Sequence, residues 1–477
     1  MDATMRAKLD RAFNPRVVAV VGAKKAADYS WLRNQQEFQG KVYSVQIDPN
    51  EIPGILELGF TNLSSLKEVP EPIDYVICAV PRNVSPRIVQ DCTETDIGGV
   101  TLFTSGFAET QTEEGVRFQE RITQMARAAN LALVGPNCMG IYNPRLGLKF
   151  GADQPFGGRA VGGAAFLSQS GSQASGFIQE AYAQGVGMSK VVSFGNGVVL
   201  EAADYLEYFA EDPDTSIIGA YIEGVRDGQR FVEVLRRVTA QKPVVIWKGG
   251  VTEDAARATR SHTASLAVPM ALWEAIMRQC NAILVHGVEE MVDTIKALQY
   301  TKPLTSGRMG LIAVAGGHSV EMADCFSREG LRVPALSERS YEQLASWFNT
   351  VGGSYRNPLE GGGNLGDEAN VERILNILED DENVDAICVE LGGGGSQARS
   401  REALDRRVAT LVAARERLTK PLWAVHGSVV LRADTQTMRE VNLALLTGGV
   451  PAFDNFTRAA RALYRFIGYS QRKLGED

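Results

Sequence analysis

The chain has four histidines in 477 residues, and His262 stands in the setting best suited to anion chemistry. It lies in the run RSHTASLA, among small and hydroxyl-bearing residues. A neutral imidazole can accept a phosphoryl group on one nitrogen when a carboxylate holds the N–H of the other. Glu223 is the candidate carboxylate, because it follows an apolar run in YIEGV, where a buried charge needs a partner. The two residues favour a catalytic histidine with a supporting glutamate.

A second candidate anion site is formed by Ser170, Gly171 and Ser172 in the run FLSQSGS. The run lies between an expected strand and an expected helix, and a helix start offers unpaired N–H donors to a phosphate. Two alternatives remain open. Ser170 could only cap the helix, or it could be a hydrolase nucleophile with Asp254 and His262, although SQSGS differs from GxSxG.

Four loops after expected strands of the N-terminal region carry small and polar residues. Loops that follow parallel strands meet at one edge of a sheet, where ligands bind in open α/β folds. These loops are Gly22 to Lys25, Ala79 to Pro81, Thr104 to Phe107 and Gly135 to Gly140, and their residues suit a ligand that lies flat across the edge. For the first loop, a plain turn with solvated lysines is the alternative to a phosphate contact. Covalent catalysis by Cys138 is disfavoured, because this region holds no histidine to activate it.

The other three histidines are weaker candidates for a functional role. His318, in the run AGGHS, occupies a loop equivalent to SQSGS, where it could contact an anion or stand beside a helix N-cap. His286 and His426 follow apolar runs and are expected to be structural. No GxxxxGK[ST] phosphate loop is present, and no metal site is predicted.

The elements that position these residues alternate along the chain. Short Val/Ile-rich runs are separated by stretches of helical period such as Glu113 to Ala129, a pattern typical of parallel sheets covered on both faces. Gly- and Pro-rich interruptions separate three units. The predicted fold is α/β, with a Rossmann-like domain at 1–147 and flavodoxin-like domains at 155–302 and 306–477. The second and third units open with similar strand–turn–helix runs, which indicates a distant duplication.

The composition excludes several classes of protein. Asp and Glu total 57 against 49 for Lys and Arg, so a nucleic-acid partner is not expected. No apolar run approaches the roughly 18 to 20 residues that span a bilayer. The N-terminal run lacks the apolar stretch of a signal peptide, and the six cysteines are scattered without a CxxC pair. This pattern favours reduced thiols and a cytoplasmic protein.

Taken together, the motifs resemble the alpha subunit of ADP-forming acyl-CoA synthetases, which are relatives of the succinyl-CoA synthetase alpha subunit. The resemblance rests on FNPRVVAVVGA, GPNCMGI, FLSQSGS, YIEGVRDG and RSHTASLA, in that order over nearly the whole chain. It implies that His262 is the phosphohistidine, that Glu223 supports it, and that the helix start at Ser170, Gly171 and Ser172 cradles phosphate. It also implies that the domain at 1–147 binds CoA, with the cofactor-binding residues Gly22, Ala23, Lys24, Lys25, Pro81, Ser105, Gly106, Asn137 and Cys138. This sequence departs from the family pattern in several loops, including AGGHS where AGGPG is common.

The resemblance also implies an activity and partners. The family converts a carboxylate, CoA and a nucleoside triphosphate to acyl-CoA, nucleoside diphosphate and phosphate, through an acyl phosphate. CoA is then a substrate, and ATP and Mg²⁺ are expected on an ATP-grasp beta subunit, in a heterotetramer, with a homodimer as the form in isolation. Two alternatives remain: an ATP-independent CoA-dependent acyl or carbamoyl transferase, and a non-catalytic CoA-binding protein.

Overall fold

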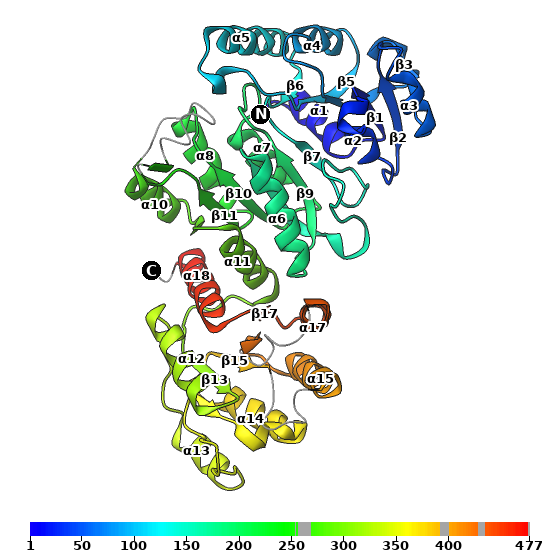
Figure 1. The fold of residues 1–477 in the computed structure, drawn as a ribbon. Coiled ribbons are helices and arrows are strands. Elements are labelled where there is room, and N and C mark those ends of the chain that lie inside the picture. The colour runs from blue at the N-terminus through cyan, green and yellow to red at the C-terminus, as the bar shows by residue number, and fades with distance from the viewer. Residues whose placement is uncertain (253, 256–268, 392–399, 428–434, 476–477) are drawn as a thin grey trace. The chain divides into compact units, whose positions relative to one another are not determined.

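The computed structural model describes residues 1–252, 254–255, 269–391, 400–427 and 435–475. The chain folds into two compact units, one made of residues 1–182 and 186–291, the other of residues 183–185 and 292–477. Three sheets alternate with helices along the chain (Figure 1). Within the described ranges, every helix is too short or too polar to cross a membrane.

The first sheet is parallel and has the strand order of a Rossmann fold. From edge to edge it contains β3 (Thr61–Leu63), β2 (Lys41–Val45), β1 (Val17–Val21), β4 (Ile73–Cys78), β5 (Ile97–Leu102) and β6 (Ala132–Val134). Helix α1 (Ala3–Phe13) packs on β4 and β5. Helices α4 (Ser85–Thr93) and α5 (Glu113–Ala128) lie side by side (Figure 1), and α2 (Ser30–Arg33) and α3 (Ile52–Glu57) are short. Because all five residues of β1 are buried, the sheet is covered on both faces.

The second sheet is joined to the first within the same unit. Its order is β12 (Ile283–Val285), β11 (Val244–Lys248), β10 (Ile217–Ile222), β8 (Val161–Ser168), β9 (Met188–Ser193) and β7 (Gly140–Tyr142). The five parallel strands β9-β8-β10-β11-β12 have the flavodoxin-like order. The sixth strand, β7, comes directly from the last loop of the first sheet and pairs antiparallel with β9. The helices are α6 (Gly171–Ala183), α7 (Ala202–Glu211), α8 (Gly228–Thr239) and α10 (Met270–Gln279). The next helix, α11 (Val288–Tyr300), begins in this unit and belongs to the other unit from Val292 on.

The third sheet repeats the flavodoxin-like order in the other unit. Its parallel strands are β14 (Leu359–Glu360), β13 (Met309–Ala313), β15 (Ala386–Glu390), β16 (Leu422–Val425) and β17 (Ala452–Phe453). Two separate cores cover it: Ile387 and Val389 face one, and Ala386 and Cys388 face the other. Its helices are α12 (Gly316–Arg328), α13 (Glu338–Ala345), α14 (Glu368–Asp380), α15 (Arg401–Arg417), α17 (Thr435–Thr447) and α18 (Phe456–Leu474).

These topologies confirm the predicted fold class. The structure adds β3, β7, β14 and β17, strands of two or three residues that were not expected from the sequence. All except β7 are parallel edge strands, and all four lack the long apolar run that marks a central strand. The predicted domain boundaries stay predictions.

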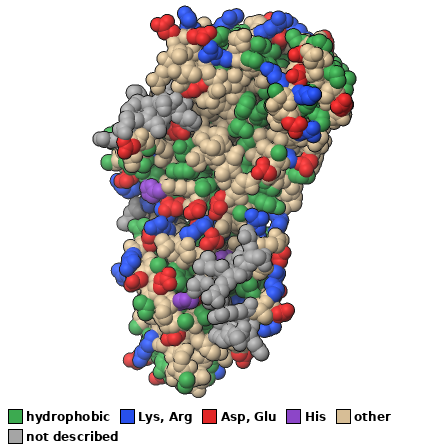
Figure 2. Space-filling model, viewed as in Figure 1, with side chains coloured by type: hydrophobic (Ala, Val, Ile, Leu, Met, Phe, Trp, Pro, Cys, Tyr) green, Lys and Arg blue, Asp and Glu red, His purple; other side chains and the backbone are tan. Residues whose placement is uncertain are grey.

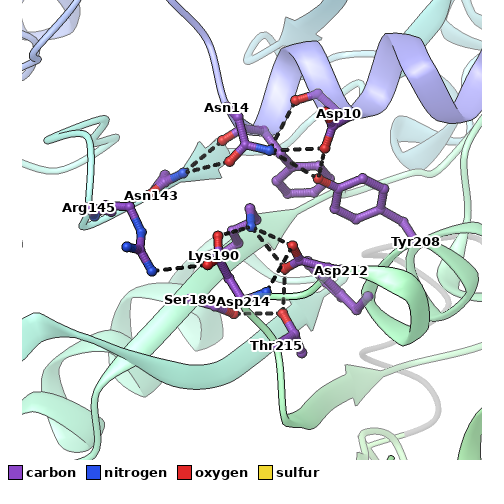
Figure 3. A network of polar contacts seen from close by, with 12 residues as sticks. Asp10, Asn14, Asn143, Arg145, Ser189, Lys190, Tyr208, Asp212, Asp214 and Thr215 are labelled. Carbon is purple, nitrogen blue, oxygen red and sulfur yellow. Dashed lines mark hydrogen bonds and ion pairs between the residues drawn. The ribbon is translucent and has the colours of Figure 1, made fainter. Parts of the chain in front are cut away.

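A polar network crosses between the first two sheets inside their common unit (Figure 3). The Lys190 ammonium on β9 donates to Asp212 Oδ1 at 2.8 Å and to Asp214 Oδ2 at 3.2 Å, and its side chain is 1% exposed. Tyr208 donates to Asp10 of α1 at 3.0 Å, and its ring stacks on Phe13 with centroids 4.6 Å apart. Removing one partner of the buried Lys190–Asp212 pair would cost about 3–5 kcal/mol within the second sheet's own domain. The contacts of Tyr208 with Asp10 and Phe13 are the ones that join the second sheet's α7 to α1 of the first sheet.

Charged side chains of both signs are intermixed over the face of the molecule drawn in Figure 2. That face has no broad basic area of the kind that binds nucleic acid. The formal net charge of -8 points the same way.

Candidate functional site

The predicted cofactor loops all follow strands that are neighbours in the first sheet. Gly22 follows β1, Pro81 follows β4, Ser105 and Gly106 follow β5, and Asn137 follows β6. Backbone contacts hold the loops together: the Asn137 N–H donates to the Thr104 carbonyl oxygen at 3.1 Å, and the Thr104 hydroxyl donates to Val80 O. The structure therefore brings these predicted residues to one edge.

The loop after β1, which begins at Gly22, packs closely against the loop after β4. Gly22 has φ +88°, and a Cβ at this position would lie 2.7 Å from Val80 Cγ1, so only glycine fits without strain. Ala23 is buried, whereas Lys24 and Lys25 are exposed. Exposed lysines beside a glycine turn can reach a phosphate of a ligand at this edge.

Cys138 differs from the other predicted contacts because its side chain is buried. Its thiol donates to the carbonyl oxygens of Leu102 and Val134, each at 3.6 Å. Burial raises the pKa of this thiol well above its usual range. The thiolate needed for covalent catalysis is therefore strongly disfavoured, and a ligand at this loop would meet backbone groups of Cys138.

The last cofactor loop continues into the second predicted site. Residue Met139 donates its backbone N–H to Ser193 Oγ at 3.1 Å, and a Cβ at Gly171 would lie 2.7 Å from Met139 Cγ. Gly171 is the first residue of α6. The predicted CoA edge and the predicted phosphate loop thus lie side by side in one unit.

The phosphate loop has the geometry of a helix start. Ser170 caps α6 through its hydroxyl, which lies 3.5 Å from the Gln173 N–H and 3.0 Å from Ser172 Oγ. Ser168 Oγ donates to the Ser170 carbonyl oxygen at 2.7 Å and fixes the turn. Ser170 is buried and Ser172 is exposed. Ser170 therefore caps the helix, and the exposed Ser172 hydroxyl stands at the helix end that favours an anion. Phosphate binding at this loop stays a prediction.

Glu223 lies at the same edge, one residue beyond β10, and is 5% exposed. The side-chain oxygen of Gln169 accepts the backbone N–H groups of Glu223 at 2.5 Å and Gly224 at 2.9 Å. Gln169 precedes the capping serine, so the phosphate loop and the Glu223 turn are held together. Burial, the neighbouring Glu223 charge and a hydrogen bond to it raise the pKa of Tyr221.

A buried lysine also holds the turn that contains Glu223. Lys248, the last residue of β11, is 6% exposed and donates to the carbonyl oxygen of Glu223 at 2.9 Å and to that of Gly249. Its Nζ lies 5.6 Å from the Trp273 ring centroid. Burial lowers the pKa of Lys248, while the charge of Glu223 raises it. The ammonium thereby fixes the ends of β10 and β11, from which the chain continues toward His262.

His262 itself lies outside the described residues. Sequence reasoning found Glu223 and the Ser170 loop but missed Gln169 and Lys248. Gln169 stood within the quoted FLSQSGS run, and a lysine at the end of an apolar run was the signal for Lys248. Among the described residues, no cluster of three or more His, Cys, Asp and Glu side chains could hold a metal ion.

The fold and these loops define a class: a CoA-binding Rossmann domain followed by a succinyl-CoA ligase-like flavodoxin domain. Residues 16–144 match the family described as CoA binding domain, and residues 161–298 match succinyl-CoA ligase like flavodoxin domain. The class therefore rests on two independent stretches of the chain.

Relatives over the full length narrow the class. The alpha subunit of acetate–CoA ligase (ADP-forming) II of Pyrococcus furiosus is 32% identical, over 96% of this chain and 97% of that protein. The dinucleotide forming acetyl-coenzyme A synthetase 1 of Ca. Korarchaeum cryptofilum, solved in complex with phosphate and ADP, matches with a TM-score of 0.81 at 26% identity, over 98% of each chain. PH0766 of Pyrococcus horikoshii matches with a TM-score of 0.79 at 27% identity, over 98% of this chain and 100% of that one.

The chain belongs to the family of the alpha subunits of ADP-forming acyl-CoA synthetases. It spans about half the length of two other curated relatives, the ADP-forming acetate–CoA ligase I of Archaeoglobus fulgidus (35% identical, 55% of its length) and the ADP-forming acetate–CoA ligase of Methanocaldococcus jannaschii (32% identical, 48% of its length). The resemblance seen in the motifs is confirmed.

Proposed function

We propose that this chain is the CoA-binding subunit of an ADP-forming acyl-CoA synthetase and carries its phosphohistidine at His262. The observation that supports this most strongly is the joint placement of Glu223 and the α6 helix start. Gln169 connects them through hydrogen bonds of 2.5 Å and 2.9 Å to the backbone after β10. A carboxylate beside an anion-binding helix start is what a phosphohistidine requires.

In synthesis, a phosphoryl group from ATP on a partner subunit is transferred to a ring nitrogen of His262. Glu223 accepts the hydrogen bond of the other ring N–H and so holds the tautomer with a free electron pair. A substrate carboxylate oxygen then attacks phosphorus, the N–P bond breaks and acyl phosphate forms. The CoA thiol, losing its proton, attacks the acyl carbon, and phosphate leaves. Helix-start N–H groups near Ser170 and Ser172 stabilise the charge on the phosphoryl oxygens.

CoA is proposed to lie along the edge formed by Gly22, Ala23, Lys24, Lys25, Pro81, Ser105, Gly106, Asn137 and Cys138. Met139 joins this edge to Gly171, so the thiol end of CoA would approach the phosphate loop. The nucleotide and Mg²⁺ are proposed to bind an ATP-grasp beta subunit, in a heterotetramer, in the cytoplasm. The relatives named as alpha subunits support a partner chain.

The test is phosphorylation in the reverse direction. The full chain is incubated with acetyl-CoA and labelled phosphate, and the bound label is tested for acid lability and base stability. Wild type is expected to gain acid-labile phosphate, and His262→Asn is expected to lose this label while it still binds CoA. Acid-labile label of wild-type extent and rate on the His262→Asn chain would contradict the assignment.

A further inference from the structure

A second set of hydrogen bonds joins the first two sheets, and Asn196 lies at its centre. Asn196 belongs to the loop that follows β9 of the second sheet, and it is buried, with an exposed fraction of 8%. Its side chain and its backbone both contact loops that end at the predicted CoA edge or the predicted phosphohistidine site. Both sheets belong to one compact unit, so all of these contacts lie inside it.

The side-chain amide of Asn196 contacts three residues from around the first sheet. Its Nδ2 donates to Oε2 of Glu109 at 2.7 Å and to Oε1 of Gln119 at 2.9 Å. Its Oδ1 accepts from Nδ2 of Asn137 at 3.4 Å. Because a carboxylate can only accept, the contact with Glu109 determines which end of the amide is the donor. All of the polar atoms of this side chain are therefore used.

Glu109 connects Asn196 to the loop after β5. Its other oxygen, Oε1, accepts the backbone N–H groups of Gly106 at 2.6 Å and Phe107 at 3.0 Å. Gly106 is one of the predicted CoA contacts, and so is Asn137. One buried amide thus holds two separate loops of the predicted CoA edge.

The backbone of Asn196 connects the same residue to the turn that carries Glu223. Nη2 of Arg226 donates to the Asn196 carbonyl oxygen at 2.6 Å. Arg226 lies three residues after Glu223, whose backbone N–H is held by Gln169 beside the phosphate loop. The Asn196 N–H donates to the Pro136 carbonyl oxygen at 3.0 Å. Hydrogen bonds therefore run from the phosphate loop to the CoA edge through Asn196.

The loop around Asn196 has little room to adjust. The preceding residue, Gly195, has φ +51°, and a Cβ there would collide with the carbonyl oxygen of Asn137. The two loops are thus in direct backbone contact. A change in the position of one loop must move the other.

We propose that Asn196 is a positioning residue for the step in which acyl-CoA and phosphate react. It holds the CoA edge through Glu109 and Asn137, and it holds the Glu223 turn through Arg226. The thioester carbon must approach phosphate bound at the start of α6, and a misplacement of about 1 Å by a change far from the reacting atoms can cost about 100-fold in rate. The inference rests on the proposed function and adds a residue to it.

Two routes to the same phosphohistidine separate positioning from general damage to the fold. With acetyl-CoA and labelled phosphate, a phosphate oxygen attacks the thioester carbon, and the CoA thiolate leaves and takes up the proton that phosphate loses. A ring nitrogen of His262 then accepts the phosphoryl group from acetyl phosphate, and acetate leaves. With labelled acetyl phosphate and no CoA, only this second transfer occurs. Both routes are followed on the full chain as acid-labile, base-stable label on tryptic peptide 261–278, which holds His262.

Asn196→Asp is the first variant. It keeps the size of the side chain, removes the amide donor and places a second carboxylate against Glu109. At saturating acetyl-CoA the first route is expected to slow about 100-fold, whereas the acetyl phosphate route should stay within about twofold of wild type. Saturation ensures that a change of CoA affinity alone does not appear as a change of rate. Equal slowing of both routes, or slowing of neither, would overturn the inference.

Glu109→Gln tests the contact itself by exchanging its two partners. Alone, it sets two amide donors against each other, so the first route should slow. Added to Asn196→Asp, its amide can donate to the new carboxylate, while its oxygen still accepts the N–H groups of Gly106 and Phe107. The double variant should recover about tenfold of the lost rate, since residues in direct contact are not additive. No recovery would contradict the role of this contact.

Ser189→Ala is the matched control. Ser189 is buried on β9, and its hydroxyl lies 2.8 Å from that of Thr215, so the variant removes a buried hydrogen bond that does not reach the first sheet. Both routes should keep their rates, and slowing of the first route alone would overturn the inference. Thermal unfolding shows that each variant is folded. A wild type without label by either route removes the proposed function and this inference together, whereas a labelled wild type with equal slowing in Asn196→Asp removes this inference alone.

Discussion

The second and third sheets share a topology but place their buried glutamates differently. In each, two residues separate the first strand from its helix, so Gly171 of α6 corresponds to Gly316 of α12. Tyr221 pairs with Ser168 in one sheet, and Val389 pairs with Ile312 in the other, so Glu390 falls at the position of Tyr221. Glu223 lies two residues further along, beyond the end of β10.

This shift changes what each carboxylate can reach. Glu390, within its strand, contacts His318 on the helix that follows the neighbouring strand. Glu223, beyond its strand, is fixed through its backbone by Gln169 and Lys248. The same fold therefore places a buried glutamate beside a histidine in one unit and, in the other, a buried glutamate in the turn after its strand.

Of the variants that test this comparison, Glu223→Gln should have the largest effect on activity. It removes the acceptor that selects the tautomer of His262, so the rate of acyl-CoA synthesis should fall roughly 10²- to 10⁴-fold, the range expected for general acid–base and orienting groups. Steady-state kinetics with the partner subunit measures kcat, and CoA affinity by calorimetry should stay unchanged. A variant with wild-type kcat would remove Glu223 from the site.

Lys248→Met tests whether the buried ammonium of Lys248 positions Glu223 at the end of β10. Methionine fills the space near Trp273 but leaves the carbonyl oxygens of Glu223 and Gly249 without their donor. We expect phosphorylation of His262 to slow about 10- to 100-fold. Lys248→Arg, which keeps a cation and donors, should recover part of this rate. Equal rates for both variants would indicate that the charge does not position Glu223.

Glu390→Gln should change the pH dependence of stability. The pKa of Glu390 is raised in the folded state, chiefly by burial, so the folded chain binds this proton more tightly than the unfolded chain. As pH rises from about 4.3 through the raised folded pKa, the wild type should therefore lose stability relative to the variant, by about 1.4 kcal/mol for each pH unit that separates the folded pKa from the unfolded one. Urea unfolding at several pH values measures the difference. A constant difference across pH would contradict the raised pKa.

Lys24→Ala should have the smallest effect. Lys24 is exposed at the predicted CoA edge, so its loss should weaken CoA binding about fivefold, roughly 1 kcal/mol, and added salt should reduce the difference. Lys41→Ala is the matched control, because Lys41 begins β2 at the opposite edge of the same sheet. Calorimetric titration with CoA compares them. An equal loss in both variants would place CoA elsewhere.

Periodicity predicted most of the fold because central strands are apolar throughout. The stretch of helical period at Glu113 to Ala129 forms α5, which ends one residue earlier. The short edge strands β3, β14 and β17 were missed, because their two or three residues carry no pattern. Their pairing depends on neighbours that are distant in sequence.

The site was predictable where a motif carries chemistry, and not where a contact depends on the folded backbone. Glu223 and Ser170 stood out because a charge or hydroxyl follows an apolar run. Gln169 acts through N–H groups 54 and 55 residues away, which no local pattern shows. Cys138 looked like a ligand contact, but its thiol turns inward to Leu102 and Val134.

The most direct measurement of the central claim is the position and chemistry of the phosphate on the wild-type chain. The chain is phosphorylated briefly from acetyl-CoA and labelled phosphate, digested at alkaline pH, and its peptides are sequenced by mass spectrometry. We predict acid-labile phosphate on His262, in peptide 261–278, ahead of any other site. Acid-stable phosphate on Ser170 or Ser172, with none on His262, would contradict the account.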